Sequence, residues 1–513
     1  MPSHGHFNSS RTRKLDLNQR EWRSWAKNGH VIASLLESGF GNLAAYLAAH
    51  VLLCLVPAFF IAGAMAALIP QEAVTRFLGR DASKAVSYPA AAAAGSLLAV
   101  CSCTIVPLFA GIYRKGAGLG PAITFLFFAP AANILALVYT GGVIGVDLAG
   151  ARFILSLAFG IGIGMIMALV FRADDAANGE AAAEAFAGPG SGRMGRGSLA
   201  FLLLWVALLL AGTFKVAFLT GNAFELTLPL GDTRPWQEAL DRLVPHDAGR
   251  GEEGITVQGV ALIALLAAIG LCAWKGFEHI HDGFNAWARA GLALIAATLL
   301  VAALAVRESG SGLVVGFTGK FFAVALLLTA LAAVARRALA REDVQAWLWE
   351  SWRFIRQIFP LLVAGVFVVG ILRALIRPEW IEALAGTNSV TGNLAGVAFG
   401  VVMYFPTLVE VPIAKMFLDL GMHRGPLLAY LMADPELSLQ SILIISAIIG
   451  RRKTAVYVGL VALFSAVAGY AYGAWVDGSP PLLVALALGA FIAALALAVS
   501  RAGATHHAMP RGT

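Results

Sequence analysis

Apolar segments about as long as a membrane helix recur along the whole of this chain. A helix needs roughly 20 apolar residues to cross the hydrocarbon core of a bilayer. Charged residues make up only 13% of the 513 residues, whereas soluble domains contain roughly a quarter. The chain is therefore predicted to be an all-α polytopic membrane protein with about a dozen helices. The expected spans are 43–69, 86–110, 118–145, 152–171, 198–220, 256–274, 290–306, 312–335, 354–376, 391–417, 424–450, 454–476 and 481–500.

Residues 1–42 predict the orientation of the chain. They are polar and basic, with no short apolar core near Met1, so we do not expect a cleavable signal. Because basic flanks tend to remain in the cytoplasm, we expect a cytoplasmic N-terminus and a bacterial-type inner-membrane protein. The net charge of +7 is scattered over such flanks, which favours lipid and a small solute as partners over nucleic acid. The four cysteines, Cys54, Cys101, Cys103 and Cys272, lie in apolar spans, unlike an extracellular disulfide framework.

Two segments of the chain match each other at a constant separation. The matching residues are glycines and prolines, which fix backbone shape and are more informative than coincidences among Leu and Ala. They pair Gly95 with Gly400, Pro107 with Pro412, Gly116 with Gly421, Gly120-Pro121 with Gly425-Pro426, Pro130 with Pro435 and Gly145 with Gly450, always 305 residues apart. The pattern predicts an internal duplication, with repeats at 43–171 and 354–476.

Helix-breaking prolines recur at corresponding places in the two repeats. One proline is expected to break a span, a second to open the next span, and a third to break that one. These are Pro107, Pro121 and Pro130 in the first repeat and Pro412, Pro426 and Pro435 in the second. Repeats with discontinuous helices at matching places are typical of secondary transporters, whose site lies where the broken helices meet. Ordinary kinks in packed helices are the alternative, but a duplicated set of three favours a transporter.

The rest of the chain is expected to frame these repeats. Residues 1–42 form a cytoplasmic basic segment, 172–353 a linker followed by an inserted transmembrane segment, and 477–513 a last transmembrane helix and tail. The insert lacks the Pro/Gly pattern of the repeats and is expected to be peripheral scaffold. Within it, residues 336–353 are rich in Arg and Trp and predict an interfacial helix.

Charge predicts how the repeats are oriented. Counting every span as a full crossing makes them parallel, but places Arg451-Arg452-Lys453 outside, against the tendency of basic loops to stay inside. The equivalent loop of the first repeat carries Asp147 and Arg152 and has no basic run. We therefore expect inverted repeats and one miscounted crossing.

A run of thiols and hydroxyls, Cys101-Ser102-Cys103-Thr104, precedes Pro107. In an extended segment, side chains two residues apart point to the same side. Two thiolates placed in this way suit a soft ion such as Cu(I), or an arsenic(III) centre. We predict Cys101 and Cys103 as metal ligands, and Ser102 and Thr104 as further solute contacts. The alternative is that these small side chains let helices pack closely. Two cysteines are too few for a closed zinc site, and Cys54 would add a third sulfur only if its helix lay alongside.

The second repeat carries carboxylates, whereas the first repeat carries thiols and hydroxyls. Glu410 lies between Pro406 and Pro412, and a carboxylate at membrane depth is a functional hypothesis by default. Lys415 is its expected partner. Asp434 and Glu436 flank Pro435, where the first repeat has alanines. We predict that the three carboxylates bind a coupling proton or balance a cationic solute, with Lys415 as the charge partner of Glu410. The alternatives are a structural Glu410–Lys415 pair, and Asp434 and Glu436 as caps of a helix near the surface.

Asn133 follows Pro130 and is either a solute contact or a helix cap. The run CSCTIVPLFAGIYRKGAGLGPAITFLFFAPAAN, residues 101–133, ends on this asparagine. It resembles the signature of the predicted permease family that includes the organoarsenical efflux permeases and related copper or zinc exporters. The resemblance covers both repeats and implies a permease that exports a soft metal or metalloid species. The second repeat departs from it, with Pro406 and Leu408 at the positions aligned with the two cysteines. A site with thiolates from both repeats is therefore not expected.

Other classes of function are less well supported by the sequence. No Walker A motif is present, so transport is expected to be secondary or powered by a separate partner, and we expect neither a cofactor nor an enzyme. One rival is a permease for a small organic or inorganic anion, using Lys415 and helix N-termini. A membrane thiol oxidoreductase lacks a cofactor motif, and a purely structural scaffold would not need buried carboxylates. Residues 278–282 (EHIHD) are interpreted as a wet interfacial loop rather than a metal site.

Overall fold

The computed structural model describes residues 32–48, 51–98, 102–185, 195–214, 216–244, 254–375, 379–402 and 407–507. Apart from one small sheet, the elements in these ranges are helices, which confirms an all-α polytopic membrane protein. In this part of the chain seven helices are long and apolar enough to cross a membrane, or nine if each of two bent pairs is one span. Several of the predicted dozen spans are pairs of shorter helices in the structure; the expected span 86–110, for example, takes in parts of the helices Lys84–Leu98 and Ser102–Arg114.

The first half begins with a helix at 32–48, which bends by 52° into the segment that ends at Leu68. Its elements are η1 (Val51–Leu55), α2 (Val56–Leu68), α3 (Gln71–Leu78), α4 (Lys84–Leu98), α5 (Ser102–Arg114), α6 (Leu119–Ala131), α7 (Ile134–Val143), α8 (Val146–Val170) and α9 (Arg172–Ala185). Local sequence explains several boundaries. Gly116 (φ 86°) and Gly145 (φ 150°) adopt positive φ in the connections before α6 and α8, where a side chain would be strained.

The second half repeats this series of helices. Its elements are α16 (Arg341–Leu375), α17 (Glu379–Ala385), α18 (Val390–Val402), α19 (Thr407–Asp419), α20 (Arg424–Leu437), α21 (Leu439–Ile449) and α22 (Arg451–Val476), followed by α23 (Pro481–His507). A shift of 305 residues superimposes the bounds of α5 on those of α19, and the starts of α6, α7 and α8 on those of α20, α21 and α22. Gly421 and Gly450 have positive φ, as do their equivalents Gly116 and Gly145. Glycines at equivalent positions therefore form equivalent turns in the two halves.

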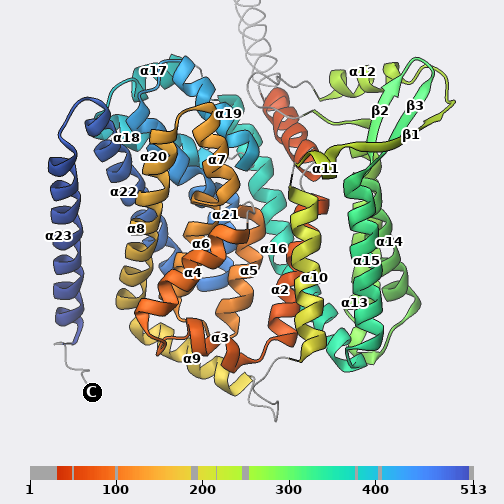
Figure 1. Ribbon diagram of the computed structural model, residues 1–513, viewed down its shortest axis with the longest axis horizontal. Helices are drawn as coiled ribbons and strands as arrows, with labels where there is room; N and C mark the ends of the chain where they lie inside the picture. The colour runs from red at the N-terminus through yellow and green to blue at the C-terminus, as the bar shows by residue number, and fades with distance from the viewer. Residues whose placement is uncertain are drawn as a thin grey trace, which may run out of the picture.

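The two halves are inverted with respect to each other. Tyr472, near the end of α22, donates a hydrogen bond to Asp147 at the start of α8 (2.8 Å). Lys453, at the start of α22, pairs with Asp174 just beyond the end of α8 (3.3 Å). Each of these equivalent helices thus begins beside the end of the other, so they run antiparallel. Figure 1 shows the same relationship, with α3 at the lower edge of the molecule and its counterpart α17 at the upper edge.

The insert packs beside the first half and carries the small sheet at one end (Figure 1). Its elements are α10 (Arg196–Thr213), α11 (Ala217–Thr220), β1 (Asn222–Leu228), α12 (Arg234–Leu243), α13 (Val257–Phe277), η3 (Ile280–Asp282), α14 (Ala286–Ala302), β2 (Ala305–Ser309), β3 (Gly312–Thr318) and α15 (Gly319–Arg337). The strands are antiparallel in the order β1-β3-β2. The expected span 312–335 was wrong at its start, because residues 312–318 form the strand β3 and the helix α15 begins only at Gly319. The apolar composition of β3 resembles that of a membrane helix.

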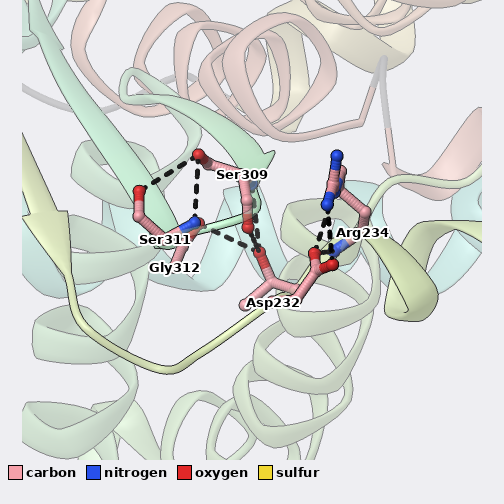
Figure 2. Close-up of polar contacts among 6 residues, drawn as sticks. Asp232, Arg234, Ser309, Ser311 and Gly312 are labelled. Atoms are coloured by element: carbon pink, nitrogen blue, oxygen red, sulfur yellow. Dashed lines mark hydrogen bonds and ion pairs between the residues drawn. The ribbon is translucent and has the colours of Figure 1, made fainter.

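Figure 2 shows how the turn between β2 and β3 is fastened to the segment before α12. The hydroxyl of Thr233 donates to the carbonyl of Gly312 (3.0 Å), and the backbone N–H of Ser309 donates back to the same hydroxyl (3.2 Å). Asp232 accepts two hydrogen bonds from the Arg234 guanidinium. The contacts of Thr233 therefore hold the turn between β2 and β3 against the segment that leads into α12.

The predicted interfacial helix at 336–353 is not a separate element. α16 begins at Arg341 and continues without a break to Leu375. Trp347 is buried, and its indole N–H donates to the carbonyl of Phe60 in α2 (2.9 Å). Trp347 thus joins α16 to the first half, whereas Trp349 and Trp352 contact His281 and Glu278 of the insert.

Candidate transport site

A buried ion pair joins the two halves. The guanidinium of Arg152 in α8 lies 3.0 Å from the carboxylate of Glu410 in α19, with 0% and 1% of the two side chains exposed. The predicted partner of Glu410 was Lys415, and this prediction was wrong. Lys415 is exposed and pairs with Asp419 one turn further along α19. Residues five positions apart on a helix face different directions, whereas residues four apart share a face.

Arg152 also reaches the point where the first half is broken. Its Nε donates to the carbonyl of Ala131 (2.7 Å), the last residue of α6, and its Nη1 donates to the hydroxyl of Thr140 in α7 (3.3 Å). Its Nη2 completes the set by donating to both carboxylate oxygens of Glu410 (3.0 and 3.3 Å). One guanidinium therefore ties α6, α7, α8 and α19 together. Arg152 was not predicted as a site residue, because the sequence pattern assigned it to a loop.

The second half has a different pair at the equivalent positions. Ala131 and Arg152 correspond to Glu436 and Tyr457 at the 305-residue shift. The phenol of Tyr457 in α22 donates to Oε2 of Glu436 in α20 (2.6 Å), and both residues are fully buried. Among the described residues, Oε1 of Glu436 has no hydrogen-bond partner. At these two equivalent positions, the first half therefore has the Arg152 guanidinium bonded to a backbone carbonyl. The second half has the Tyr457 phenol bonded to the Glu436 carboxyl group.

Asp434 and Glu436 do not cap a helix near the surface, as one alternative proposed. Both are buried inside α20, on either side of Pro435. α20 ends one residue after Glu436 and bends by 46° into α21. Asp434 lies 0% exposed against the backbone of Gly400 in α18. The two carboxyl groups therefore lie in the protein interior beside the break of the second half.

Asn133 occupies the matching break of the first half, between α6 and α7. Its side-chain oxygen accepts a hydrogen bond from the backbone of Ala136 (2.8 Å), and its amide nitrogen donates to the carbonyl of Pro130 (3.3 Å). Asn133 is therefore a helix cap in this structure. Because both ends of its amide are engaged, contact with a solute would require the break to open.

The six prolines lie within their helices. Pro121 and Pro426 occupy the third positions of α6 and α20, where a missing N–H costs nothing. α5 continues through Pro107, and α19 through Pro412, so the prediction that these residues break a span was wrong. Each is the sixth of the 13 residues of its helix, where it removes one hydrogen bond without ending the helix. The breaks after α6 and α20 follow Pro130 and Pro435. Residues 99–101, before α5, and 403–406, before α19, lie outside the described residues.

The predicted thiol ligands lie at the edge of the described structure. Cys101 is outside the described residues, as are the side chains of Ser102 and Cys103. Thr104 is buried, and its hydroxyl contacts the sulfur of Cys54 in η1 (2.7 Å). The structure thus brings Cys54 beside the start of α5. In the part of the chain that is described, no three His, Cys, Asp or Glu side chains are grouped closely enough to hold a metal ion.

The acidic and histidine-rich loop after α13 has structural partners. Glu278 accepts a hydrogen bond from the indole of Trp352 and pairs with Arg356, both at 2.6 Å. The bond from Trp352 and the charge of Arg356 hold the pKa of Glu278 below its ordinary value. His281 packs its ring against Trp349. These contacts agree with the interpretation of the loop as an interfacial element.

Comparison with known proteins agrees with this architecture. Residues 38–474 match the family described as Predicted permease (ArsP_1). The UPF0718 protein MJ0584 of Methanocaldococcus jannaschii is 30% identical over 442 residues, which cover 86% of this chain and 97% of that protein. The UPF0718 protein YraQ of Escherichia coli is 29% identical over 99 residues, 19% of this chain and 28% of that protein. No solved structure matches. The alignment with MJ0584 is too long to exclude residues 172–353, so part of the insert is shared. The chain therefore belongs to the predicted permease family.

Proposed function

We propose that this permease exports a soft metal or metalloid species, of the organoarsenical, copper or zinc class, by secondary transport. The observation that carries the proposal is the pair of unlike polar contacts at equivalent positions of two inverted halves: Arg152 with Ala131, and Tyr457 with Glu436. Inverted halves with broken helices support alternating access around a fixed site. Buried charged groups in such a place are expensive to maintain, which supports a role in transport.

The choice of a soft solute rests on the sulfur-bearing segment. Cys101 directly precedes α5, Cys103 is the second residue of that helix, and Cys54 lies against its start through Thr104. Sulfur donors select soft cations over hard ones. An anion is less well supported, because Lys415 is exposed and already paired with Asp419. Arg152, the buried cation of the site, is fully engaged by Glu410, Ala131 and Thr140.

The coupling ion in this proposal is a proton that binds the buried carboxyl groups. Glu436 has one oxygen on the Tyr457 phenol and one oxygen without a described partner. A charged carboxylate without a counter-ion is costly to bury, and binding a proton or a cationic solute removes that cost. Glu410 already has its counter-ion in Arg152. Glu436, with Asp434 beside it, is therefore assigned to proton binding, and the Arg152–Glu410 pair to holding the halves together.

The test is solute flux in everted membrane vesicles containing the full chain. Methylarsenite, Cu(I) and Zn(II) are supplied separately, with and without a pH gradient. We expect accumulation of at least one of these species. In Cys101→Ser/Cys103→Ser we expect this accumulation to fall by roughly 10- to 100-fold or more, as when metal sites lose supporting groups. Cys272→Ser is the matched control, because Cys272 lies buried in α13 of the insert, and its flux should equal that of the unmodified chain.

Three results would each overturn a different part of the proposal. No flux of any thiophilic species, with the protein present and folded, would remove the soft-solute assignment. Flux that persists unchanged in the double cysteine variant would remove the thiol pathway while leaving secondary transport in place. Flux indifferent to a collapsed pH gradient would remove the proton as coupling ion.

A further inference from the structure

An apolar cavity lies outside the transport site, between the insert and the two halves. It has a volume of about 800 Å³ and is bounded by α2, α10, α14, α15 and the start of α16. A cavity of this size matches those that hold drug-sized ligands. Its floor is an aromatic cluster of Phe60, Phe201, Trp205 and Trp347, in which Phe60 stacks on Trp205 (4.9 Å between ring centroids). Its walls are aliphatic, with Leu292, Ile295, Leu328 and Leu331 among them.

One end of this cavity is strongly basic. Arg289 at the start of α14, Arg336 in the last turn of α15 and Arg341 at the start of α16 all line it. All three are exposed, and none forms an ion pair with an acidic side chain within the described ranges of the chain. Arg341 instead lies over the ring of Phe284, 5.9 Å from its centroid. The cavity thus combines an apolar interior with three cations that lack a described counter-ion.

This basic end lies at one surface of the membrane. Figure 1 shows the lower ends of α14 and α15 at the same edge of the molecule as α3 and α9. Close by, the ammonium of Lys275 lies over the ring of Trp287 (4.6 Å), and nearly half of that tryptophan is exposed. Tryptophans and basic residues of this kind favour the headgroup level of a bilayer. A ligand of the cavity would therefore have its polar end among headgroups and its apolar end inside the protein.

We propose that this cavity is a binding site for an anionic phospholipid. The acyl chain would occupy the space above the aromatic floor, and the phosphate would bind Arg289, Arg336 and Arg341. Guanidinium groups are suited to bidentate binding of phosphate oxygens. A soluble anion would leave the apolar interior empty, and a neutral lipid would leave the three cations without a counter-charge. Basic pockets between transmembrane helices bind anionic headgroups by the same physics.

An occupant of this site would also support the transport domain. Phe60, in the floor, belongs to α2, and α2 packs against α5, the helix whose start holds the predicted ligand Cys103. An empty apolar cavity lowers stability because the side chains around it lack contacts. A bound acyl chain is therefore expected to stabilise the packing of the insert against the first half.

The experiment is native mass spectrometry of the full-length purified protein, incubated with phosphatidylglycerol or phosphatidylcholine of the same acyl chains. We expect a retained phosphatidylglycerol adduct. Its affinity should fall about fivefold for each of the three arginines replaced by Gln, the contribution of one basic residue to binding of anionic lipid. Arg337→Gln is the matched control, because Arg337 is the exposed neighbour of Arg336 and does not line the cavity. Its affinity should not change.

A second variant tests the apolar part without altering charge. Ala296→Phe, at a small residue of the wall, should displace the phosphatidylglycerol adduct by filling the cavity. Glycerol 1-phosphate, which carries the headgroup chemistry without acyl chains, should not compete. Equal binding of the two lipids, or full binding by the arginine triple variant, would overturn the proposal. Displacement by glycerol 1-phosphate would reassign the site to a soluble phosphate.

Discussion

Phe159 and Phe464 are equivalent residues of the two inverted halves, and their rings pack edge to face with centroids 4.8 Å apart. Phe159 lies in α8 and Phe464 in α22, separated by the 305 residues that relate all the matched positions. When a residue contacts its own equivalent, the symmetry axis passes between the two. The pseudo-twofold axis of this protein therefore runs between α8 and α22, close to the centre of each helix.

Replacing this pair should reveal a specific coupling. An edge-to-face aromatic pair contributes about 0.5–1.5 kcal/mol beyond the burial of its rings. We expect Phe159→Ala and Phe464→Ala to show that coupling energy in a double-mutant cycle, measured by SDS-induced unfolding of the purified protein. Phe491 also packs on Phe464, and the structure shows no ring contact between Phe491 and Phe159. Phe159→Ala and Phe491→Ala should therefore couple more weakly than Phe159→Ala and Phe464→Ala, because these two rings meet only through Phe464. Equal coupling in both cycles would contradict the axis.

Neutralising one member of the buried ion pair should be far more damaging than neutralising both. Glu410→Gln leaves the Arg152 guanidinium buried without its counter-ion, which costs about 3–5 kcal/mol. The double variant Arg152→Met/Glu410→Met should recover most of that loss, since buried pairs are often no better than apolar residues of similar volume. Unfolding free energies of the three proteins provide the measurement.

Lys415→Gln is the surface control for this comparison. Lys415 and Asp419 are 45% and 62% exposed, so breaking their pair should cost at most about 1 kcal/mol. A single Glu410→Gln variant as stable as the double variant would show that Arg152 finds another partner or becomes hydrated.

Replacing Glu436, the proposed proton-binding residue, should leave downhill transport intact but abolish its acceleration by a pH gradient. Glu436→Gln keeps the volume of the side chain and an oxygen that can accept the Tyr457 hydrogen bond, but it cannot bind a coupling proton. We expect downhill solute flux to continue, while acceleration by an imposed pH gradient disappears. Asp419→Asn, a surface carboxylate of α19, should retain that acceleration. Gradient-dependent flux in Glu436→Gln would assign the proton to Asp434 or another group.

The sequence was sufficient to recognise the duplication but not the partner of Glu410. Glycine and proline constrain the backbone locally, so Gly116 and Gly421 report the same turn wherever they lie in the chain. A side-chain pair such as Arg152–Glu410 spans 258 residues and depends on how α8 packs against α19. Arg152 was assigned to a loop because hydropathy starts that span at residue 152. The helix in fact begins at Val146, after the turn at Gly145.

The predictions for Lys415 and for β3 failed for two different reasons. Helix periodicity alone places Lys415 beside Asp419 rather than Glu410, so this contact was predictable without the tertiary structure. The strand Gly312–Thr318 was not, because a short apolar run bounded by glycines fits either a strand or the start of a helix. Only its pairing with β1 and β2 decides between them.

The stability of the loop after α13 should depend on acid. Because Trp352 and Arg356 hold the pKa of Glu278 below its ordinary 4.5, this carboxylate contributes stability above that pH. The contribution is lost as the pH falls through the lowered pKa. Glu278→Gln should therefore lower the free energy of unfolding at pH 7, by at most about 1 kcal/mol for a partly exposed group, and the deficit should vanish in acid. Glu342→Gln, at an exposed position of α16, is the surface control for this comparison. A deficit that persists at pH 3 would assign the effect to packing.

The distribution of basic residues between the two faces predicts the orientation of the protein in the membrane. At the face formed by α3 and α9 (Figure 1), Arg80 closely follows α3, Lys84 begins α4 and Arg336 lies in the last turn of α15. Arg341 lines the same cavity as Arg336. The run Arg451–Lys453 begins α22, and Lys453 pairs with Asp174 of α9. Basic residues accumulate on the cytoplasmic side, so we expect this face to be cytoplasmic. α23 ends at the same face, whereas the helix at 32–48 starts at the opposite one. This expectation opposes the cytoplasmic N-terminus predicted from residues 1–42.

Reporter fusions distinguish these two orientations. Green fluorescent protein fused after α23 should fluoresce, and alkaline phosphatase at the same position should be inactive. The reverse result would restore the orientation predicted from the N-terminal segment. It would also place the basic end of the lipid cavity in the outer leaflet. A fusion after Leu243, the last residue of α12, which packs beside β2 on the opposite face, provides the control, because it should give the opposite pair of signals from the same protein.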